Sequence, residues 1–271
     1  MSTLSPAVPE VPRLTELNVL ARGGDATVYR ANILPINHQV AVKVYNRTLE
    51  GDEDRRRFIQ EVRAVARLSA HPHVVDIFDV GVTQDGQPYL IMEVCDGSYR
   101  DRMTAALLSA AEASDVGAKI ADALEEAHAV GVLHGGVKPA NILVTRLGEP
   151  ALADFGLAVL GQPRNASMKA EVNLSYTAPE VFFQGRLVAA SDVYCLCATL
   201  YAFMRGRPPQ WRDIYAPTLP SLLGMVTERA PDLAGVPAEL TALLRRGIAN
   251  DPAARPSAAQ LRDELLRIRD S

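Results

Sequence analysis

The sequence lacks the features of membrane, secreted and nucleic-acid-binding proteins. No apolar run reaches the about eighteen residues that span a bilayer, and the N-terminus has no basic region followed by an apolar one. The three cysteines, Cys95, Cys195 and Cys197, are an odd number without metal-like spacing, so we expect free, buried thiols. The net charge of −4 gives no reason to expect nucleic-acid or membrane partners. We therefore expect a cytoplasmic protein.

The bulk composition is that of an ordinary globular protein. Hydrophobic residues make up 48% and charged residues 22% of the 271-residue chain, which is long enough to bury about three quarters of its unfolded surface. Neither an internal repeat nor a second domain is visible. Residues 1–13 hold three prolines among small residues without an apolar period, which predicts a disordered leader.

Hydrophobic periodicity divides the rest of the chain into a strand-rich part and a helix-rich part. Strand-like runs occupy residues 40–44, 74–82 and 88–94. Between the first two of these runs, a helical pattern begins near Asp52. Further helical patterns follow at residues 110–130 and 189–204, with two more within residues 234–269.

Five short motifs occur in order along the chain. They are Ala21–Val28, Val40–Lys43, the octet H-G-G-V-K-P-A-N at His134–Asn141, the D-F-G at Asp154–Gly156 and the A-P-E at Ala178–Glu180. Their order and spacing resemble the glycine-rich loop, lysine strand, catalytic loop, metal-binding motif and activation-segment end of protein kinases. The residues of these motifs are most similar to those of bacterial Ser/Thr kinases.

The resemblance covers about residues 14 to 270 and implies an α+β, bilobal, protein-kinase-like fold. A small β-rich N-lobe is expected at residues 14–94, a hinge at 95–98 and a larger helical C-lobe at 99–271.

The nucleotide lysine and its partner follow from this resemblance. Lys43 lies in the middle of an apolar strand, and Glu61 lies beside the apolar stripe of the following helix. In kinases these two residues form the ion pair that orients the α- and β-phosphates. The alternative is a surface lysine and a solvated helix charge.

The glycine-rich loop is degenerate. Only Gly23 matches one of the three family glycines, because Ala21 and Ala26 fill the outer positions. Asp25, near the loop tip, would repel a bound phosphate. We expect weakened phosphate binding, and a polar hairpin turn is the alternative interpretation of this stretch.

The resemblance also assigns an adenine site and a metal site. Adenine would lie against Val28, Ala41, the gatekeeper Met92, the Glu93 carbonyl, the Cys95 amide and Leu143, several of which would be equally ordinary as core residues. Asn141 and Asp154 would coordinate magnesium or manganese, and Lys138 would lie against the γ-phosphate. The implied cofactors are ATP and a divalent metal.

The substrate side departs from the family pattern at three positions. Gly136 stands where kinases have the aspartate that accepts the substrate hydroxyl proton, and such a base is worth about 10²- to 10⁴-fold in rate. Asn173 replaces a threonine of the same network. Gly135 replaces the arginine that, in many kinases, binds a phosphate on the activation loop. We assign no residue a catalytic role.

Two structural anchors of the family are present. Asp192, near the start of an apolar helix, resembles the buried aspartate that binds the catalytic-loop backbone; an N-terminal helix charge is the alternative. Arg255 matches the arginine that pairs with the glutamate of A-P-E, here Glu180.

The sequence favours a pseudokinase that binds ATP and a divalent metal and acts as a regulatory or scaffolding module. The alternatives are a weakly active Ser/Thr kinase and a scaffold that does not bind nucleotide. Expected partners are a signalling protein or an upstream kinase. Homodimerisation through the N-lobe is suggested by bacterial relatives.

Overall fold

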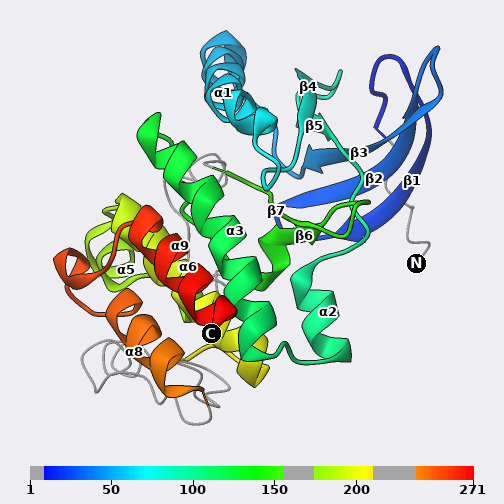
Figure 1. Cartoon of the computed structure of the whole chain (residues 1–271). Coiled ribbons are helices and arrows are strands. Elements are labelled where there is room, and N and C mark those ends of the chain that lie inside the picture. Colours follow the sequence, from blue (N-terminus) through cyan, green and yellow to red (C-terminus); the bar gives the residue numbers. More distant parts are fainter. Residues whose placement is uncertain (1–8, 156–173, 210–235) are drawn as a thin grey trace, which may run out of the picture. The chain divides into compact units, whose positions relative to one another are not determined.

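The computed structural model describes residues 9–155, 174–209 and 236–271 of the chain (Figure 1). They form two compact units. The sheet unit contains residues up to Ala70 together with Val75–Cys95, and the helical unit contains His71–Val74 and the chain from Asp96 onward. The division at Cys95 falls within the range where the hinge was expected.

The sheet unit is built on five antiparallel strands in the order β1-β2-β3-β5-β4. The strands are β1 (Leu14–Arg22), β2 (Ala26–Ile33), β3 (His38–Tyr45), β4 (Ile77–Val82) and β5 (Pro88–Met92). Adjacent strands are consecutive except where β5 lies between β3 and β4. Residues 74–76, predicted as the start of β4, precede that strand.

The alternation of side chains along β3 gives the sheet two different faces. On one face, Val40, Val42 and Val44 are buried in an apolar core with residues of β2 and β5. Ala41 and Lys43 point to the other face. That face also receives helix α1 (Gly51–Ala66), because the Tyr45 ring stacks edge-on against Phe58 of the helix.

Residues 9–13, predicted to belong to a disordered leader, are instead packed on the sheet. Val11 is only 6% exposed and belongs to the core that covers Val42. The amide of Leu34 donates to the Arg13 carbonyl at 2.9 Å, which fixes the end of this segment. The leader prediction is therefore wrong for residues 9–13, because burial of Val11 in the core of the sheet favours an ordered segment despite the neighbouring prolines.

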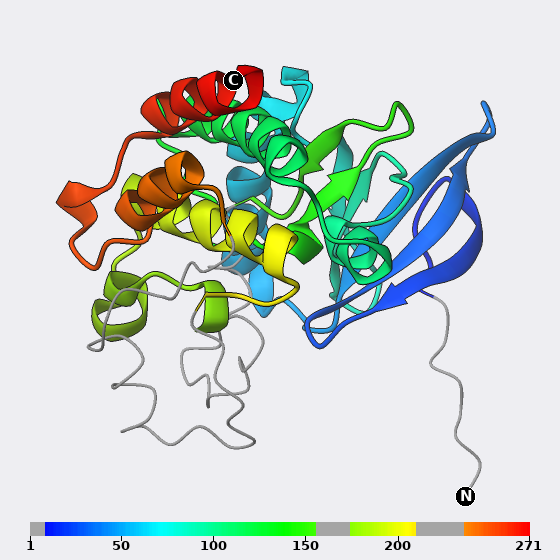
Figure 2. The ribbon, with the colours of Figure 1, turned by 60° about the horizontal axis from the view of Figure 1, so that its bottom comes forward.

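The helical unit packs around α3. Its described helices are α2 (Tyr99–Ala105), α3 (Ala110–Ala129), α5 (Pro179–Gln184), α6 (Ala189–Arg205), α8 (Ala238–Gly247) and α9 (Ala258–Asp270). Ser109 caps α3 by accepting from the Glu112 amide, while Glu112 accepts from the Ser109 amide. In Figure 2, α9 lies along α3, and α6 contacts both.

A short hairpin of β6 (Ile142–Val144) and β7 (Pro150–Leu152) completes this unit. Residues 71–74, which the sequence placed in the N-lobe, pair with it: the Leu152 amide donates to the His73 carbonyl at 2.8 Å. Among the described helices, none is long and apolar enough to cross a membrane.

Candidate functional site

The segment that resembles a catalytic loop is held by one buried carboxylate. Asp192, in the first turn of α6, is 0% exposed and accepts from the backbone amides of His134 at 2.9 Å and Gly135 at 2.7 Å. His128, at the end of α3, contributes its Nε2 at 2.8 Å. The prediction that Asp192 anchors this backbone is confirmed.

The His134 ring continues the same network. Its Nδ1 accepts from the Gly136 amide at 3.0 Å, so Nε2 carries the proton and donates to the Ala153 carbonyl at 2.8 Å. Burial lowers the pKa of His134 and outweighs the opposing influence of Asp192. A neutral imidazole thus links the loop to the residue that precedes Asp154.

Gly136 occupies an ordinary backbone position with space beside it. Its carbonyl accepts from the Asn141 side-chain amide at 2.9 Å. A Cβ added at Gly136 would meet Asn141 Nδ2 at 3.8 Å and His134 Nδ1 at 3.9 Å, which are normal contacts. The loop therefore retains room for a side chain at the position where kinases carry the aspartate, and no carboxylate is present there.

Asn141 and Asp154 lie at the same end of the β6–β7 hairpin. Ile142 pairs with Leu152, and the Ala153 amide donates to the Asn141 carbonyl at 2.8 Å. Asp154 has φ of 67°, a backbone conformation that costs a non-glycine residue about 1–3 kcal/mol. The side-chain nitrogen of Asn141 donates to the Gly136 carbonyl. The side-chain oxygen of Asn141 and the carboxylate of Asp154 are hard oxygen donors, the type that Mg²⁺ and Mn²⁺ prefer.

Lys138 and Leu143 belong to the same unit. Lys138 is half-buried in extended backbone before Pro139, and Leu143 lies on β6, bridged to Ser98. The structure thus brings Lys138, Asn141, Leu143 and Asp154 into one short stretch of the helical unit.

The remaining predicted nucleotide residues lie in the sheet unit. The pairings Val28 with Lys43 and Ala41 with Met92 place these four side chains on the face of the sheet that α1 covers. Glu93 follows β5 and exchanges hydrogen bonds with Asp76. The sheet therefore presents Val28, Ala41, Lys43 and Met92 together, as expected of one binding surface.

Glu61 is placed on α1 as expected, but its observed partner differs from the predicted one. Its Oε1 lies 3.0 Å from Arg57 Nε, and its Oε2 is buried without a hydrogen bond from any described residue. The Lys43 ammonium lies 5.3 Å from the centre of the Tyr45 ring. Among the described residues the structure gives no ion pair between Lys43 and Glu61, so their pairing stays a prediction.

Sequence reasoning missed the residue that holds the loop at Ala21–Val28, which resembles a glycine-rich loop. Asn46, just after β3, donates its side-chain amide to the carbonyls of Gly23 at 3.2 Å and Gly24 at 3.0 Å. Its backbone amide donates to the Asp25 carbonyl at 2.8 Å. The sequence signal for these hydrogen bonds is an asparagine directly after the strand that pairs with the strand following the loop.

The predicted pair of Glu180 and Arg255 is confirmed. Arg255 donates to both carboxylate oxygens, at 2.7 and 2.9 Å, with side-chain exposures of 0% and 6%. Burial acts to raise the pKa of Glu180, but hydrogen bonds from Arg255 and Ser191 outweigh it and hold the pKa below its ordinary range. This pair joins α5 to the turn before α9.

The space beside Gly135, the position where many kinases have an arginine, is occupied by another side chain. Gly135 has φ of 73°, and a Cβ added there would meet Leu187 Cδ2 at 2.9 Å. A neighbouring apolar side chain thus occupies the space beside the loop. Gly156 and Asn173 lie outside the described residues.

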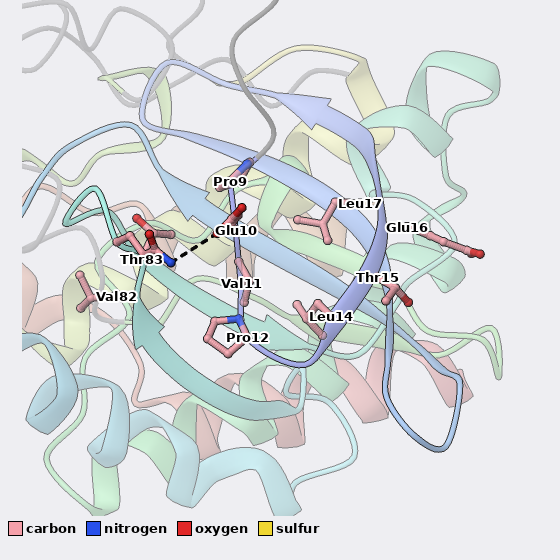
Figure 3. Close-up of a pocket in the computed structure, with 11 residues that line it drawn as sticks. Pro9, Glu10, Val11, Pro12, Leu14, Thr15, Glu16, Leu17, Val82 and Thr83 are labelled. Carbon is pink, nitrogen blue, oxygen red and sulfur yellow. Dashed lines mark hydrogen bonds between the residues drawn. The ribbon is translucent and has the colours of Figure 1, made fainter.

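A pocket of about 520 Å³ in the sheet unit is separate from these residues. It lies between the 9–17 segment and residues 82–84, where Gln84 donates to Glu10 at 3.3 Å (Figure 3). None of the predicted site residues lines it.

Comparison with known proteins agrees with this geometry. A family model described as "Protein kinase domain" matches residues 14–265. The chain belongs to the protein kinase domain family. The kinase domain was thus correctly predicted, and with it the fold: a five-stranded antiparallel N-lobe sheet and a helical C-lobe.

The similar proteins are bacterial Ser/Thr kinases. Serine/threonine-protein kinase PknK of Mycobacterium tuberculosis is 36% identical over 96% of this kinase domain, and PknH of the same organism is 35% identical over 89%. The chain spans 24% of PknK and 39% of PknH. A crystal structure of the M. tuberculosis PknI kinase domain matches with a TM-score of 0.75 at 28% identity, covering 99% of this chain and 100% of that one.

Proposed function

We propose that this kinase domain is a pseudokinase, which binds ATP with a divalent metal and transfers phosphate poorly or not at all. The observation that carries the proposal is Gly136. The loop around it is anchored by Asp192 and ordered through His134, yet the proton-accepting position holds only hydrogen. A base at this position is worth about 10²- to 10⁴-fold.

The nucleotide half of the proposal rests on retained donors. Lys43 would bind the α- and β-phosphates, and Lys138 would contact the γ-phosphate. Asn141 and Asp154 supply oxygen ligands for Mg²⁺ or Mn²⁺, which when bound would neutralise phosphate charge. Such a site needs few protein ligands, since Mg²⁺ keeps waters and phosphate oxygens.

The alternative of a weakly active Ser/Thr kinase is supported by the same ordered loop. Phosphoryl transfer depends largely on positioning and charge stabilisation, which do not require the base. The Gly136→Asp variant separates the two, because its Cβ fits without displacing a neighbour.

The test is transfer of radiolabelled γ-phosphate to the chain itself and to generic protein substrates. We expect little or no transfer by the wild type and a gain of about 10²-fold or more in Gly136→Asp, with Gly136→Ala as the control. Robust wild-type transfer that is lost in Lys43→Met would overturn the pseudokinase proposal.

The third candidate, a scaffold that does not bind nucleotide, is supported by Ala21, Asp25 and Ala26 in the glycine-rich loop. In either non-catalytic role, the domain would act in the cytoplasm through a protein partner or an upstream kinase. N-lobe homodimerisation belongs to the same proposal. Because the chain spans only part of its relatives, these roles are proposed for the domain alone.

A further inference from the structure

Helix α1 carries a row of arginines on the side opposite its buried stripe. Phe58, Val62 and Val65 are buried. Arg56, Arg63 and Arg67 are exposed, and at 3.6 residues per turn they lie within about 40° of one another around the helix axis. Arg67 begins the short 3-10 helix that continues α1, and its backbone is still right-handed helical. We call these three residues the arginine ridge.

Within α1, acidic residues lie close to the arginine ridge only at its start, where Asp52 and Glu53 are one turn before Arg56. Arg63 and Arg67 are four residues apart, a spacing at which like charges destabilise a helix by about 0.2–0.5 kcal/mol. Neither makes a hydrogen bond or ion pair with a described residue, and Arg56 donates from its Nε to the Asp52 backbone carbonyl at 3.2 Å. The arginine ridge is positively charged although the net charge of the whole chain is −4.

The helix dipole explains only part of the pattern. Basic residues near the C-terminal end of a helix are favourable, which accounts for Arg63 and Arg67. Arg56 lies in the second turn, close to the positive end, where the dipole disfavours a cation. A row of cations that is interrupted by Gln60, and that the stability of the helix does not require, points to an external anion.

We propose that the arginine ridge is a docking surface for an acidic, extended segment of a partner protein. Along the axis, Arg56 and Arg63 are about 10.5 Å apart and Arg63 and Arg67 about 6 Å. An extended chain presents alternate side chains about 6.7 Å apart, so carboxylates two residues apart match Arg63 and Arg67. Guanidinium groups bind carboxylates in a two-point geometry.

Nucleic acid fits the arginine ridge less well. Duplex DNA carries one negative charge per about 1.7 Å of axis, and three cations along about 16 Å would neutralise few of them. The shared chemistry of the site is therefore that of a short carboxylate-bearing peptide.

The experiment mixes the whole chain with a fluorescein-labelled peptide of alternating Glu and Ser. Binding of the peptide is measured by fluorescence anisotropy, at low salt and at about 0.3 M salt. We expect Arg63→Glu/Arg67→Glu to weaken binding at least about tenfold. Arg205→Glu/Arg207→Glu, which makes the same charge change at two exposed arginines of the helical unit, should bind like the wild type. Higher salt should weaken wild-type binding.

Failure of the acidic peptide to bind the wild type would overturn the proposal. So would equal binding by both double variants, equal binding of an alternating Gln and Ser peptide, or tighter binding of a DNA duplex or of vesicles containing phosphatidylserine. If circular dichroism shows that the Arg63→Glu/Arg67→Glu variant has lost helix, the Arg63→Gln/Arg67→Gln variant is used in its place. None of these outcomes depends on nucleotide binding or phosphate transfer.

Discussion

Two adjacent glycines in the catalytic loop have opposite structural requirements. Gly136 has ordinary backbone angles and space beside it, so the fold does not require glycine at this position. Gly135 has φ of 73° and faces Leu187 at a distance that a methyl group would violate. A side chain at position 135 would thus conflict with the backbone conformation and with Leu187, whereas the Cβ of an aspartate at position 136 would fit.

Replacing each glycine by alanine should separate these two cases. Gly135→Ala should destabilise the fold by about 1–2 kcal/mol because of its left-handed backbone, with Leu187 adding to the cost. Gly136→Ala should be stabilising by about 0.4–1 kcal/mol, since alanine restricts the unfolded chain. Urea unfolding measures both, and equal effects would contradict this account.

At the scale of elements, the ion pair between Glu180 and Arg255 connects segments far apart in the sequence. It joins the start of α5 to the turn before α9, and Arg255 also stacks 4.9 Å from the Tyr194 ring of α6. The pair is nearly fully buried, so removing either partner leaves a charge that water does not reach.

Arg255→Ala should therefore destabilise the domain by about 3–5 kcal/mol. The matched control is Arg246→Ala, which breaks a surface pair with Glu264 and should cost at most about 1 kcal/mol. Urea unfolding of both variants at neutral pH makes the comparison. A similar cost for the two would mean that burial of the Glu180 pair has no energetic consequence.

The same pair predicts a pH dependence. The folded-state pKa of Glu180 lies below its unfolded value of about 4.3, so the unfolded chain binds more protons and stability falls as the pH drops. The contribution is complete above that unfolded value and is lost as the pH falls through the folded pKa. The difference in stability between wild type and Glu180→Gln should shrink on acidification below about pH 5; a difference that grows would reverse the assigned sign.

The segment at residues 9–13 acts as a structural element without regular secondary structure. Val11→Ala removes two carbons from a core position and should cost about 1.6 kcal/mol, at about 0.8 kcal/mol per buried carbon. Val130→Ala, at a position 56% exposed, is the control and should change stability by less than about 0.5 kcal/mol. Equal effects in thermal unfolding would place Val11 outside the core.

Local pattern predicted the elements well where periodicity is strong and failed where burial depends on distant partners. The helix expected at 110–130 is α3, and the one at 189–204 is α6. Val11 is not part of a periodic apolar pattern. It is buried because it packs on the sheet face formed by β2, β3 and β5. Asn46 and Leu187 were missed for the same reason, since their roles depend on contacts with loops distant in sequence.

At the scale of the whole molecule, the residues predicted to bind nucleotide and metal are divided between the two units. The sheet unit holds Lys43 and the apolar residues beside it, and the helical unit holds Asn141 and Asp154. Motif order predicted this division because each motif is local in sequence. The pairing of Glu61 with Arg57 was not predicted, since an exposed arginine one turn earlier competes for the same carboxylate.

Binding of ATP with metal should therefore stabilise the chain as a whole. Ligand at a hundred times its dissociation constant adds about 2.7 kcal/mol, a rise in Tm of several degrees for a chain of this size. We expect this rise with millimolar ATP in magnesium or manganese, but not in EDTA and not in Asp154→Asn, which keeps the volume and removes the charge. A metal-dependent rise that Asp154→Asn abolishes would support the predicted metal site. The absence of a shift in every condition would favour the scaffold, with the kinase motifs kept only for the fold.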